Sequence, residues 1–434
     1  MNAPINPPRP GRRGFPTWTL ALALSTVLIA GWAAFLALAP PPQVVPPPAA
    51  VAADPQVEST PVNQVRLLVG RDAIAVDVLA NFTADTGLKV VLDIYDTNEQ
   101  SEVLAASAAN PPDVIMVSGV GLKALVGLDL LQTIPRTDLV NARNIDPALA
   151  ARTVIYDSDN THSVPLLWGT IGLGFNAAKL AERLGPAAVP DSWAALFDPS
   201  IAAKLADCGI QVIDSPTGVF PIALAYLGLP TESVKIEDTD AATRLWESIR
   251  PSIAKFSSQD IIDNLAVGTV CLAVATSGDA YQARDRARIA GLANDIRYAL
   301  PKEGAVVLYE LLAIPRASVN SANALRLIDY LLRPEVAARM TNAKGFANAV
   351  LGSTLYVKPE IKSDPALAPD LGNLRAMAEM SPAPAVAALR NRFWQLINAP
   401  VAAPPPAPAL APAPDPAPDP VTEAPPAAKS PTAP

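Results

Sequence analysis

The stretch that decides the fold is TVCLAVATSGD at residues 269–279, which a helical segment and then DIRYALPKEGAVVLYELLAIP at residues 295–315 follow. Residues 270–275 are small, apolar or β-branched, which predicts a strand buried on both faces. Asp279 stands where a helix over residues 280–290 begins, so its carboxylate either caps that helix or faces a ligand at the carboxyl end of the strand. The chain then returns in a short strand, turns, and leaves in a long strand at Val306–Ile314. This order suits a chain that crosses from one α/β lobe to another.

Upstream, strand patterns alternate with helix patterns. Strands are predicted at Gln64–Val69, Leu88–Ile94 and Val114–Val117, each before a helix, which is typical of a mainly parallel sheet between helices. Ligand contacts in such sheets gather at the carboxyl ends of strands, so the Gly70–Asp72 segment and Ser118 are candidates on geometry alone. Asp72 is also the candidate N-cap of a helix whose apolar face begins at Ile74.

A second crossing strand is predicted at Val164–Asn176, which is long, apolar and interrupted by glycines. Helix and strand patterns from Ala177 to Val267 predict the second lobe. A cleft between two such lobes is a common site for small molecules.

Composition limits the function. The chain has 434 residues, a net charge of −8, 47 prolines, two cysteines and one histidine. The acidic balance argues against a nucleic-acid partner, which needs a basic face. The single histidine, His162, excludes multi-histidine metal sites and is predicted as a solvated loop residue. No metal site, no cofactor and no nucleophile–base pair stands out, so an enzyme is the third-ranked hypothesis.

The N-terminal region predicts a membrane anchor. Residues 17–39 are apolar and uncharged, and roughly 23 residues at 1.5 Å each cross a bilayer core. Arginines precede this helix, which places residues 1–16 in the cytoplasm and the rest outside it. A cleaved signal peptide with a site near Ala50–Ala52 is the alternative, and Arg12–Phe15 also resembles a twin-arginine export signal.

Two Pro/Ala-rich segments flank the folded part. Residues 40–62 are predicted as an extended linker, and residues 399–434 as a disordered tail. For the tail we favour a solvated segment over a spacer or a contact site for another envelope component.

Short strings in a fixed order carry a family resemblance: NFTADTGLKVV at 81–91, DTNE at 96–99, LWGTIG at 167–172, PDSW at 190–193, SQ at 258–259, SGD at 277–279, PKEGA at 301–305 and YLLRPE at 330–335. With them, nearly all of residues 63–398 resembles the putrescine/spermidine-binding proteins of ATP-driven importers. The resemblance implies an α/β, type II periplasmic-binding-protein fold with two lobes joined by crossing strands. Lobe 1 would comprise residues 63–165 and 301–345, lobe 2 residues 166–300, and residues 346–398 would add helices packed on the lobes.

The resemblance also implies a ligand site and a disulfide. The implied ligand contacts that remain are Asp72, Ser118 and Asp279, with Glu310 in place of an aspartate. Cys208 and Cys271 match a cysteine pair that is bonded in some family members, which would suit an oxidising compartment; two free thiols are the alternative.

Several implied contacts differ from the family pattern. The family's aromatic, hydroxyl and acidic contacts fall here on Gly70, Arg71, Ala73, Gly218, Thr276, Leu308 and Phe346. Losing about two aromatic contacts to a cation, at ~2 kcal/mol each, weakens binding roughly a thousandfold. Arg71 would add a like charge near an amine and would favour a ligand that also carries a carboxylate.

Each remaining contact has a structural alternative. Asp72 and Asp279 would then be helix caps only, Glu310 would face solvent, and Arg71 would pair with Asp72 or point away.

Two functional hypotheses follow. The first is a membrane-tethered, monomeric solute-binding protein that closes on a small amine and presents it to an inner-membrane ABC permease from the periplasmic side. The second is a binding-protein fold reused as a sensory or scaffold domain, with weak, amino-acid-like or no ligand binding.

Overall fold

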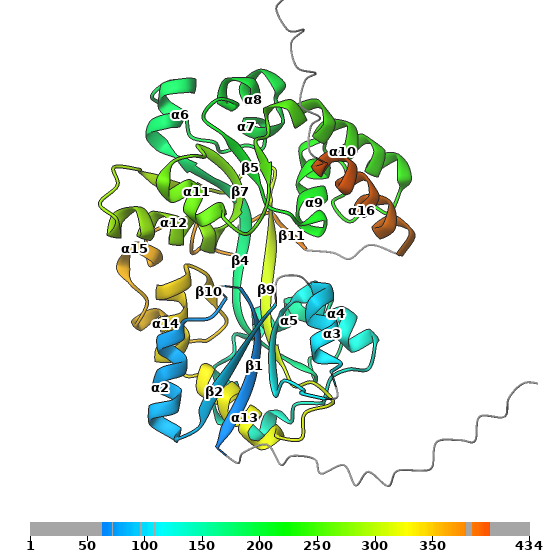
Figure 1. The fold of residues 1–434 in the computed structure, drawn as a ribbon, viewed down its shortest axis with the longest axis vertical. Helices are drawn as coiled ribbons and strands as arrows, with labels where there is room; N and C mark the ends of the chain where they lie inside the picture. The colour runs from blue at the N-terminus through cyan, green and yellow to red at the C-terminus, as the bar shows by residue number, and fades with distance from the viewer. Residues whose placement is uncertain are drawn as a thin grey trace, which may run out of the picture. The chain divides into compact units, whose positions relative to one another are not determined.

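The protein is built around one mixed β-sheet, drawn in Figure 1. A computed structural model describes residues 63–71, 73–95, 98–107, 109–372, 374–378 and 384–399. The strands are β1 Gln64–Gly70, β2 Lys89–Tyr95, β3 Val114–Ser118, β4 Ser163–Asn176, β5 Ile210–Val212, β6 Lys255–Phe256, β7 Leu272–Thr276, β8 Ile296–Ala299, β9 Ala305–Ala313, β10 Ala347–Asn348 and β11 Ala376–Ala378. Their order across the sheet is β2-β1-β3-β9-β4-β7-β5-β6, with β8 and β10 paired to β4 and β11 paired to β9.

The direction of the strands changes at the centre of the sheet. The pairs β1–β2, β1–β3, β5–β6 and β5–β7 are parallel, as the alternating pattern predicts. The pairs β3–β9, β4–β9 and β4–β7 are antiparallel. The expectation of a mainly parallel sheet is therefore correct for the two wings and wrong for the centre. The reason is that β4 and β9 are long strands that enter both wings, in opposite directions.

Helices cover the sheet. They are α2 Val76–Thr86, α3 Asn98–Ala105, α4 Gly119–Gly127, α5 Pro147–Thr153, α6 Ala177–Leu184, α7 Ala194–Phe197, α8 Pro199–Leu205, α9 Pro216–Tyr226, α10 Ile236–Ile249, α11 Ile261–Val267, α12 Ser277–Ile289, α13 Ser321–Leu331, α14 Pro334–Lys344, α15 Pro359–Lys362 and α16 Pro384–Asn398. Four short 3₁₀ helices are η1 Arg136–Asp138, η2 Val140–Asn144, η3 Arg250–Ser252 and η4 Ser353–Leu355.

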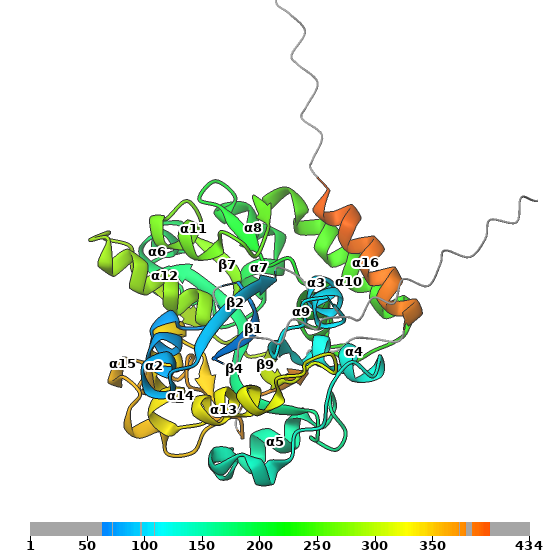
Figure 2. The ribbon, with the colours of Figure 1, turned by 60° about the horizontal axis from the view of Figure 1, so that its bottom comes forward.

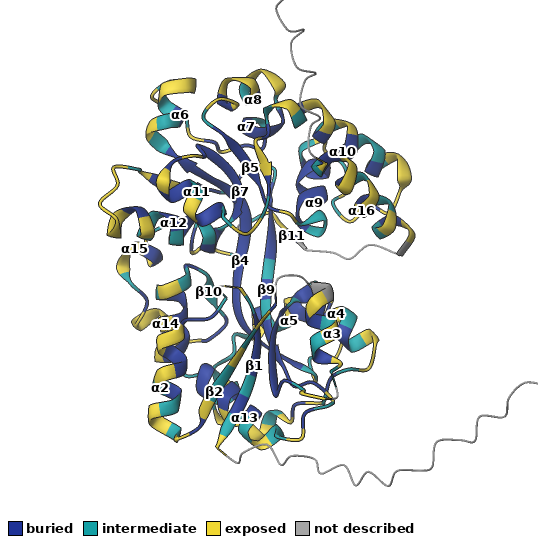
Figure 3. Cartoon of the chain, in the orientation of Figure 1, coloured by how far each residue is buried: buried dark blue, intermediate teal, exposed yellow. Residues whose placement is uncertain are grey.

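The apolar cores divide along the sheet. One core gathers β5, β7, α9 and α10 with the second half of β4, from Ile171 to Phe175. Two further cores lie on either side of β1 and β3, and both include residues of β9. All fourteen residues of β4 are buried, as the dark central strands of Figure 3 show. Strands β4 and β9 therefore contribute to cores in both wings of the sheet.

Asp72 lies outside the described residues. Helix α2 begins at Val76 with Ala75 as its N-cap and no side-chain cap, so the prediction that Asp72 caps this helix is wrong. Before the helix, Ala73 N donates to Gly70 O at 3.1 Å. Gly87 closes the helix in the left-handed region, at φ 72°, as predicted.

His162 is held in place by Asp157. Its backbone N donates to Asp157 Oδ2 at 2.9 Å, and its Nδ1 lies 3.2 Å from Asp157 Oδ1. The side chain of Asp157 is 2% exposed, so its carboxylate needs donors within the protein. His162 therefore lies in a loop, as predicted, but its side chain is only 27% exposed, so it is partly rather than fully solvated.

The disulfide that the resemblance implies is present between Cys208 and Cys271. It joins the segment before β5 to the start of β7, across a separation of 63 residues. Closing a loop of that length contributes about 4 kcal/mol in the chain-entropy model.

The structure does not test the predictions made for the two ends of the chain, which lie outside the described residues. These are the predictions of a stub, a transmembrane helix and a linker over residues 1–62, and of a tail beyond Ala399. None of the helices within the described ranges combines the length and apolar composition needed to cross a membrane.

Helix α16 packs against α9 and α10, and Figures 1 and 2 both place it beside α10. Trp394 anchors it: the indole Nε1 donates to Asp214 Oδ1 at 2.6 Å. The same ring lies edge-on to Trp246 and Phe256, with centroids 5.7 Å and 4.9 Å away. Trp394 is 3% exposed, so α16 completes the core of this wing.

Replacing this anchor should destabilise the protein. We expect Trp394→Ala to lower the free energy of unfolding by about 3–5 kcal/mol, because a large buried ring is lost. Leu396, on the same helix, is 65% exposed, and Leu396→Ala should change stability by less than about 0.5 kcal/mol. Urea denaturation measures both values. Equal effects of the two substitutions would show that α16 adds little to the core.

Candidate functional site

One row of residues crosses the end of β3 and the middle of β9 and β4. In the strand register, Glu310 on β9 lies opposite Ser118 on β3 and opposite Leu167 on β4. Antiparallel partners project to the same face of a sheet, so these three residues share a face. Two of the sequence-predicted site residues, Ser118 and Glu310, are therefore neighbours, although 192 positions separate them in the chain (310 − 118).

The same face continues toward β7. Leu308 lies opposite Gly169, and Val306 lies opposite Ile171, which in turn faces Thr276 at the end of β7. Because side chains alternate along a strand, these rows lie on the face that carries Glu310. We call this surface the central face, defined by Ser118, Leu167, Gly169, Ile171, Thr276, Val306, Leu308 and Glu310.

Asp279 follows the central face directly, at the start of α12. The Thr276 Oγ1 accepts from Asp279 N at 3.0 Å, and the Asp279 Oδ2 accepts from Thr276 N at 3.0 Å. This reciprocal pair is a capping box. The prediction that Asp279 takes part in capping is correct, but the helix begins three residues earlier than predicted, with Thr276 as its N-cap and Asp279 as its third residue. The capping box fixes a partly exposed carboxylate at this edge of the central face.

Phe346 packs against both β4 and α12. A Cβ built on Gly169 would lie 2.4 Å from Phe346 Cδ1, and one built on Gly278 would lie 2.5 Å from Phe346 Cε2. Both positions therefore need glycine if the ring is to stay where it is. The ring lies next to the start of α12, which carries Asp279, so an aromatic surface borders a carboxylate here.

Ile171 packs against Gly218, the position where the family resemblance implies an acidic contact. Gly218 is buried in the first turn of α9 (Pro216–Tyr226), and a Cβ there would lie 2.5 Å from Ile171 Cδ1. Ile171 is itself 1% exposed. A longer side chain at position 218 therefore cannot enter without moving Ile171.

Three helices begin at this face. The N-cap side chains of Ser118 (α4), Ser215 (α9) and Thr276 (α12) accept backbone N–H bonds of 3.1, 3.2 and 3.0 Å. Helix N-termini carry partial positive charge. An ammonium group on the central face would therefore depend on Glu310 and Asp279 to offset that charge.

Arg71 is exposed just beyond β1, and its backbone N donates to Tyr95 O at 3.2 Å. Asp72, its neighbour, lies outside the described residues, so the structure places only the carboxyl end of β1 and not the predicted Asp72 contact. Glu310 is partly buried, not fully solvated, on the face described above.

The sequence did not identify the contact of Tyr298 with Thr170, whose side chain projects to the face of β4 opposite the central face. Its hydroxyl donates to Thr170 O at 2.8 Å and lies 2.9 Å from Thr170 Oγ1, which joins β8 to β4. Burial raises the pKa of Tyr298, so the hydroxyl stays a donor at any physiological pH. The strand pattern at Ile296–Leu300 indicated only a strand, because this contact depends on how β4 and β8 pair.

The described residues hold no group of three or more His, Cys, Asp or Glu side chains arranged to bind a metal ion. The central face offers one carboxylate, Glu310, and two hydroxyl groups, and the carboxylate of Asp279 and the ring of Phe346 border it. That set can bind a cation with hydrogen-bond donors and an apolar body.

Comparisons with known proteins agree with this geometry. A model of the bacterial extracellular solute-binding protein family matches residues 77–369. The putrescine-binding periplasmic protein of Pseudomonas aeruginosa strain UCBPP-PA14 is 36% identical over 298 residues, which cover 69% of this chain and 81% of that protein. The putrescine-binding periplasmic protein of Escherichia coli K12 is 35% identical over 299 residues, with the same coverage of each.

A solved structure has the same fold. The spermidine/putrescine ABC transporter substrate-binding protein of Streptococcus pneumoniae superposes with a TM-score of 0.66 at 20% identity, over 77% of this chain and 98% of that one. At this identity, the likeness concerns the fold alone.

The capping box should be measurable. We expect Thr276→Val to lower the free energy of unfolding by about 1 kcal/mol, because Asp279 N loses its side-chain acceptor while the shape is kept. Thr276→Ser retains the hydroxyl and should stay close to the unsubstituted protein. Denaturant unfolding compares the two variants; equal stability of Val and Ser would contradict the capping box.

Proposed function

Because the chain belongs to the bacterial extracellular solute-binding protein family, we propose that it binds a polyamine such as putrescine at the central face and presents it to an ABC permease. The observation that carries this proposal is the placement of Ser118, Glu310 and Asp279 around one face, beside the Phe346 ring. The relatives with more than 30% identity are named for putrescine binding, which supports the same ligand class.

The two carboxylates suit a cation with an ammonium group at each end. Val306 lies in the same row as Thr276 and is four positions along β9 from Glu310, which is roughly 13 Å at ~3.3 Å per residue. Asp279 stands next to the row of Thr276, so the two carboxylates lie at opposite ends of the central face. One ammonium group would then bind at each carboxylate, and the methylene chain would lie between them along Leu308 and Phe346.

Asp72 and Arg71 complete the proposal at the carboxyl end of β1. In the proposed site, Asp72 is a third carboxylate, and Arg71 limits the number of amines that the site can hold. Thr276, Leu308 and Gly218 lack the aromatic and acidic groups expected there, so we propose an affinity below that of the putrescine-binding relatives.

Transport would follow from hinge motion. We propose that lobe 1, residues 63–165 and 301–345, and lobe 2, residues 166–300, close about β4 and β9, which belong to the cores of both wings. Residues 346–398 would stay packed on the lobes. The protein would act as a monomer that binds without catalysing a reaction.

The proposed location is the periplasmic side of the inner membrane. The relatives above are periplasmic by name, and the Cys208–Cys271 disulfide suits an oxidising compartment. We propose that a helix at residues 17–39 tethers the protein there. The comparisons give no support to the sensory or scaffold alternative.

Isothermal titration of the full-length protein with putrescine, spermidine and a panel of amino acids tests the proposal. We expect heat with the polyamines. Asp279→Asn keeps an oxygen for the capping box but removes the charge, and Glu310→Gln does the same at the other end. Each should weaken polyamine binding about ten- to a hundredfold, as loss of a charge-assisted hydrogen bond predicts.

Glu182→Gln, at an exposed position of α6, is the matched control and should leave the affinity unchanged. If heat is measured with amino acids and not with polyamines, the ligand is one that carries a carboxylate, and the proposed polyamine class is wrong. No heat with any compound would refute the proposed function.

Leu308→Phe should strengthen polyamine binding. A ring at this partly exposed position on the central face would add a cation–π contact of about 1–2 kcal/mol, close to tenfold in affinity. Leu308→Met adds no ring and should leave the affinity within about twofold. The ratio of the two dissociation constants is the measurement, and a ratio near one would show that position 308 does not face the ligand.

A further inference from the structure

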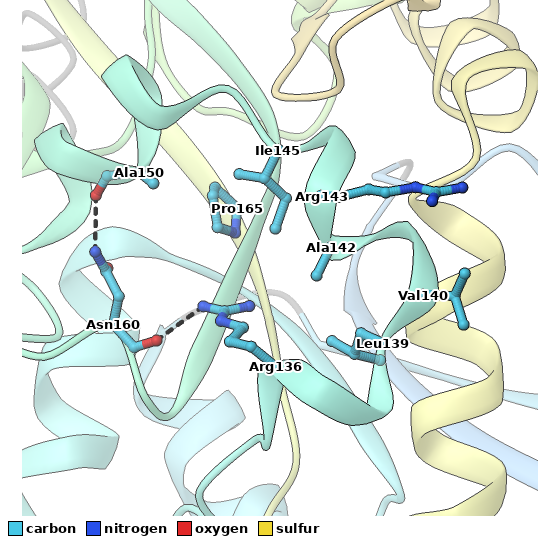
Figure 4. Close-up of a pocket in the computed structure, with 9 residues that line it drawn as sticks. All are labelled: Arg136, Leu139, Val140, Ala142, Arg143, Ile145, Ala150, Asn160 and Pro165. Carbon is cyan, nitrogen blue, oxygen red and sulfur yellow. Dashed lines mark hydrogen bonds between the residues drawn. The ribbon is translucent and has the colours of Figure 1, made fainter.

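A hollow of about 420 Å³ lies away from the central face, between η1, η2, α5 and the start of β4. Its lining residues are Arg136, Leu139, Val140, Ala142, Arg143, Ile145, Ala150, Asn160 and Pro165, and Figure 4 shows them around it. None of the residues that define the central face lines this hollow. Its volume falls in the range of small-molecule sites.

The walls are mainly apolar and the charge is of one sign. Six of the nine lining side chains are aliphatic or proline, two are arginines, and none is a carboxylate. Apolar walls with one charged group are typical of sites that orient a small ligand. A cation would be repelled here, whereas an anion would be attracted.

Arg136 supplies the specific donor. Its Nη2 donates to the backbone carbonyls of Asn160, at 2.8 Å, and Ser163. Its Nη1 is buried, and no described residue forms a hydrogen bond with it. Burial lowers the pKa of Arg136, although the carboxylate of Asp157 opposes this effect, so the guanidinium is short of solvation. Nη1 is covered by neighbouring atoms, so an anion in the hollow reaches it once the Arg136 side chain turns toward the hollow, and the anion would then satisfy it.

Asp157 is not the hydrogen-bond acceptor for Arg136 Nη1. Its Oδ2 accepts from His162 N at 2.9 Å and from Ser163 Oγ at 3.0 Å, and its Oδ1 lies 3.2 Å from His162 Nδ1. The nearest buried carboxylate is therefore already bonded to the His162 loop, and it attracts Arg136 only at a distance.

The wall beside Arg136 is already ordered. Asn160 Nδ2 donates to Ala150 O at 2.9 Å, and Asn160 Oδ1 accepts from Thr153 Oγ1 at 3.0 Å. Both the Asn160–Arg136 and Asn160–Ala150 bonds are drawn in Figure 4. The part of the wall that Asn160 forms would therefore lose little conformational entropy when a ligand binds. Arg143 is exposed and, in Figure 4, extends away from Arg136, so it belongs to the rim.

We propose that this hollow is a second binding site, for a small monocarboxylate with a compact apolar body. The carboxylate binds Arg136, and the apolar part packs against Leu139, Ala142 and Pro165. The site takes an anion, in contrast to the cation proposed for the central face, and shares no lining residue with that face, so we expect the two ligands to bind independently.

Titration of the full-length protein with sodium benzoate, with and without putrescine, tests this site. Benzoate should bind equally in both conditions. Acetate, which lacks the apolar body, and inorganic phosphate should bind at least tenfold more weakly. Arg136→Gln should weaken benzoate binding at least tenfold, and Arg244→Gln, an exposed control on α10 in the other wing, less than threefold.

A second variant keeps Arg136 and its backbone contacts. Ala142→Leu adds bulk inside the hollow and should weaken benzoate binding at least tenfold, even if Arg136→Gln lowers stability. Benzoate binding that is absent at millimolar concentration, or equal in Ala142→Leu and the unsubstituted protein, would overturn the proposal. Phosphate or acetate binding as tightly as benzoate would overturn the ligand class.

Discussion

The antiparallel pairing of β4 with β9 is the constraint on which the rest of the structure depends. Both strands are buried for nearly their whole length and supply residues to the cores of both wings. Their register aligns Glu310 with Leu167 and Val306 with Ile171. A shift of one residue would send Glu310 into the opposite core, because alternate side chains of a strand face opposite sides. The composition of the central face is thus fixed by backbone pairing.

Much of this framework could be predicted from the sequence because it is local. Helix α6 has the predicted bounds, Ala177–Leu184, since Asn176 caps it through its side chain. The buried strand before Asp279 is also found, as β7. The sequence indicated a cap at Asp279 but not its partner, Thr276, which forms the N-cap of the capping box. The crossing strand over Val164–Asn176 is confirmed within one residue.

The contacts that could not be predicted are those that join distant segments. The hydroxyl of Tyr298 reaches Thr170 across 128 positions, and the indole of Trp394 reaches Asp214 across 180. Nothing local marks either residue. The loop position of His162 was predicted, but its bond to the buried Asp157 was not, because that contact depends on how the loop folds. The family resemblance supplied the residues of the candidate site, and the strand register shows which of them share a face.

The contact between Ile171 and Gly218 has a consequence for how this protein's specificity can change in evolution. An acidic residue at position 218 requires the Ile171 side chain to move, because a Cβ there would lie 2.5 Å from Ile171 Cδ1. A smaller residue at position 171 would make that room. That substitution removes buried volume from a strand shared by both wings, so by itself it would lower stability. Substitutions at positions 171 and 218 are therefore coupled, and the effect of each on stability depends on which residue occupies the other position.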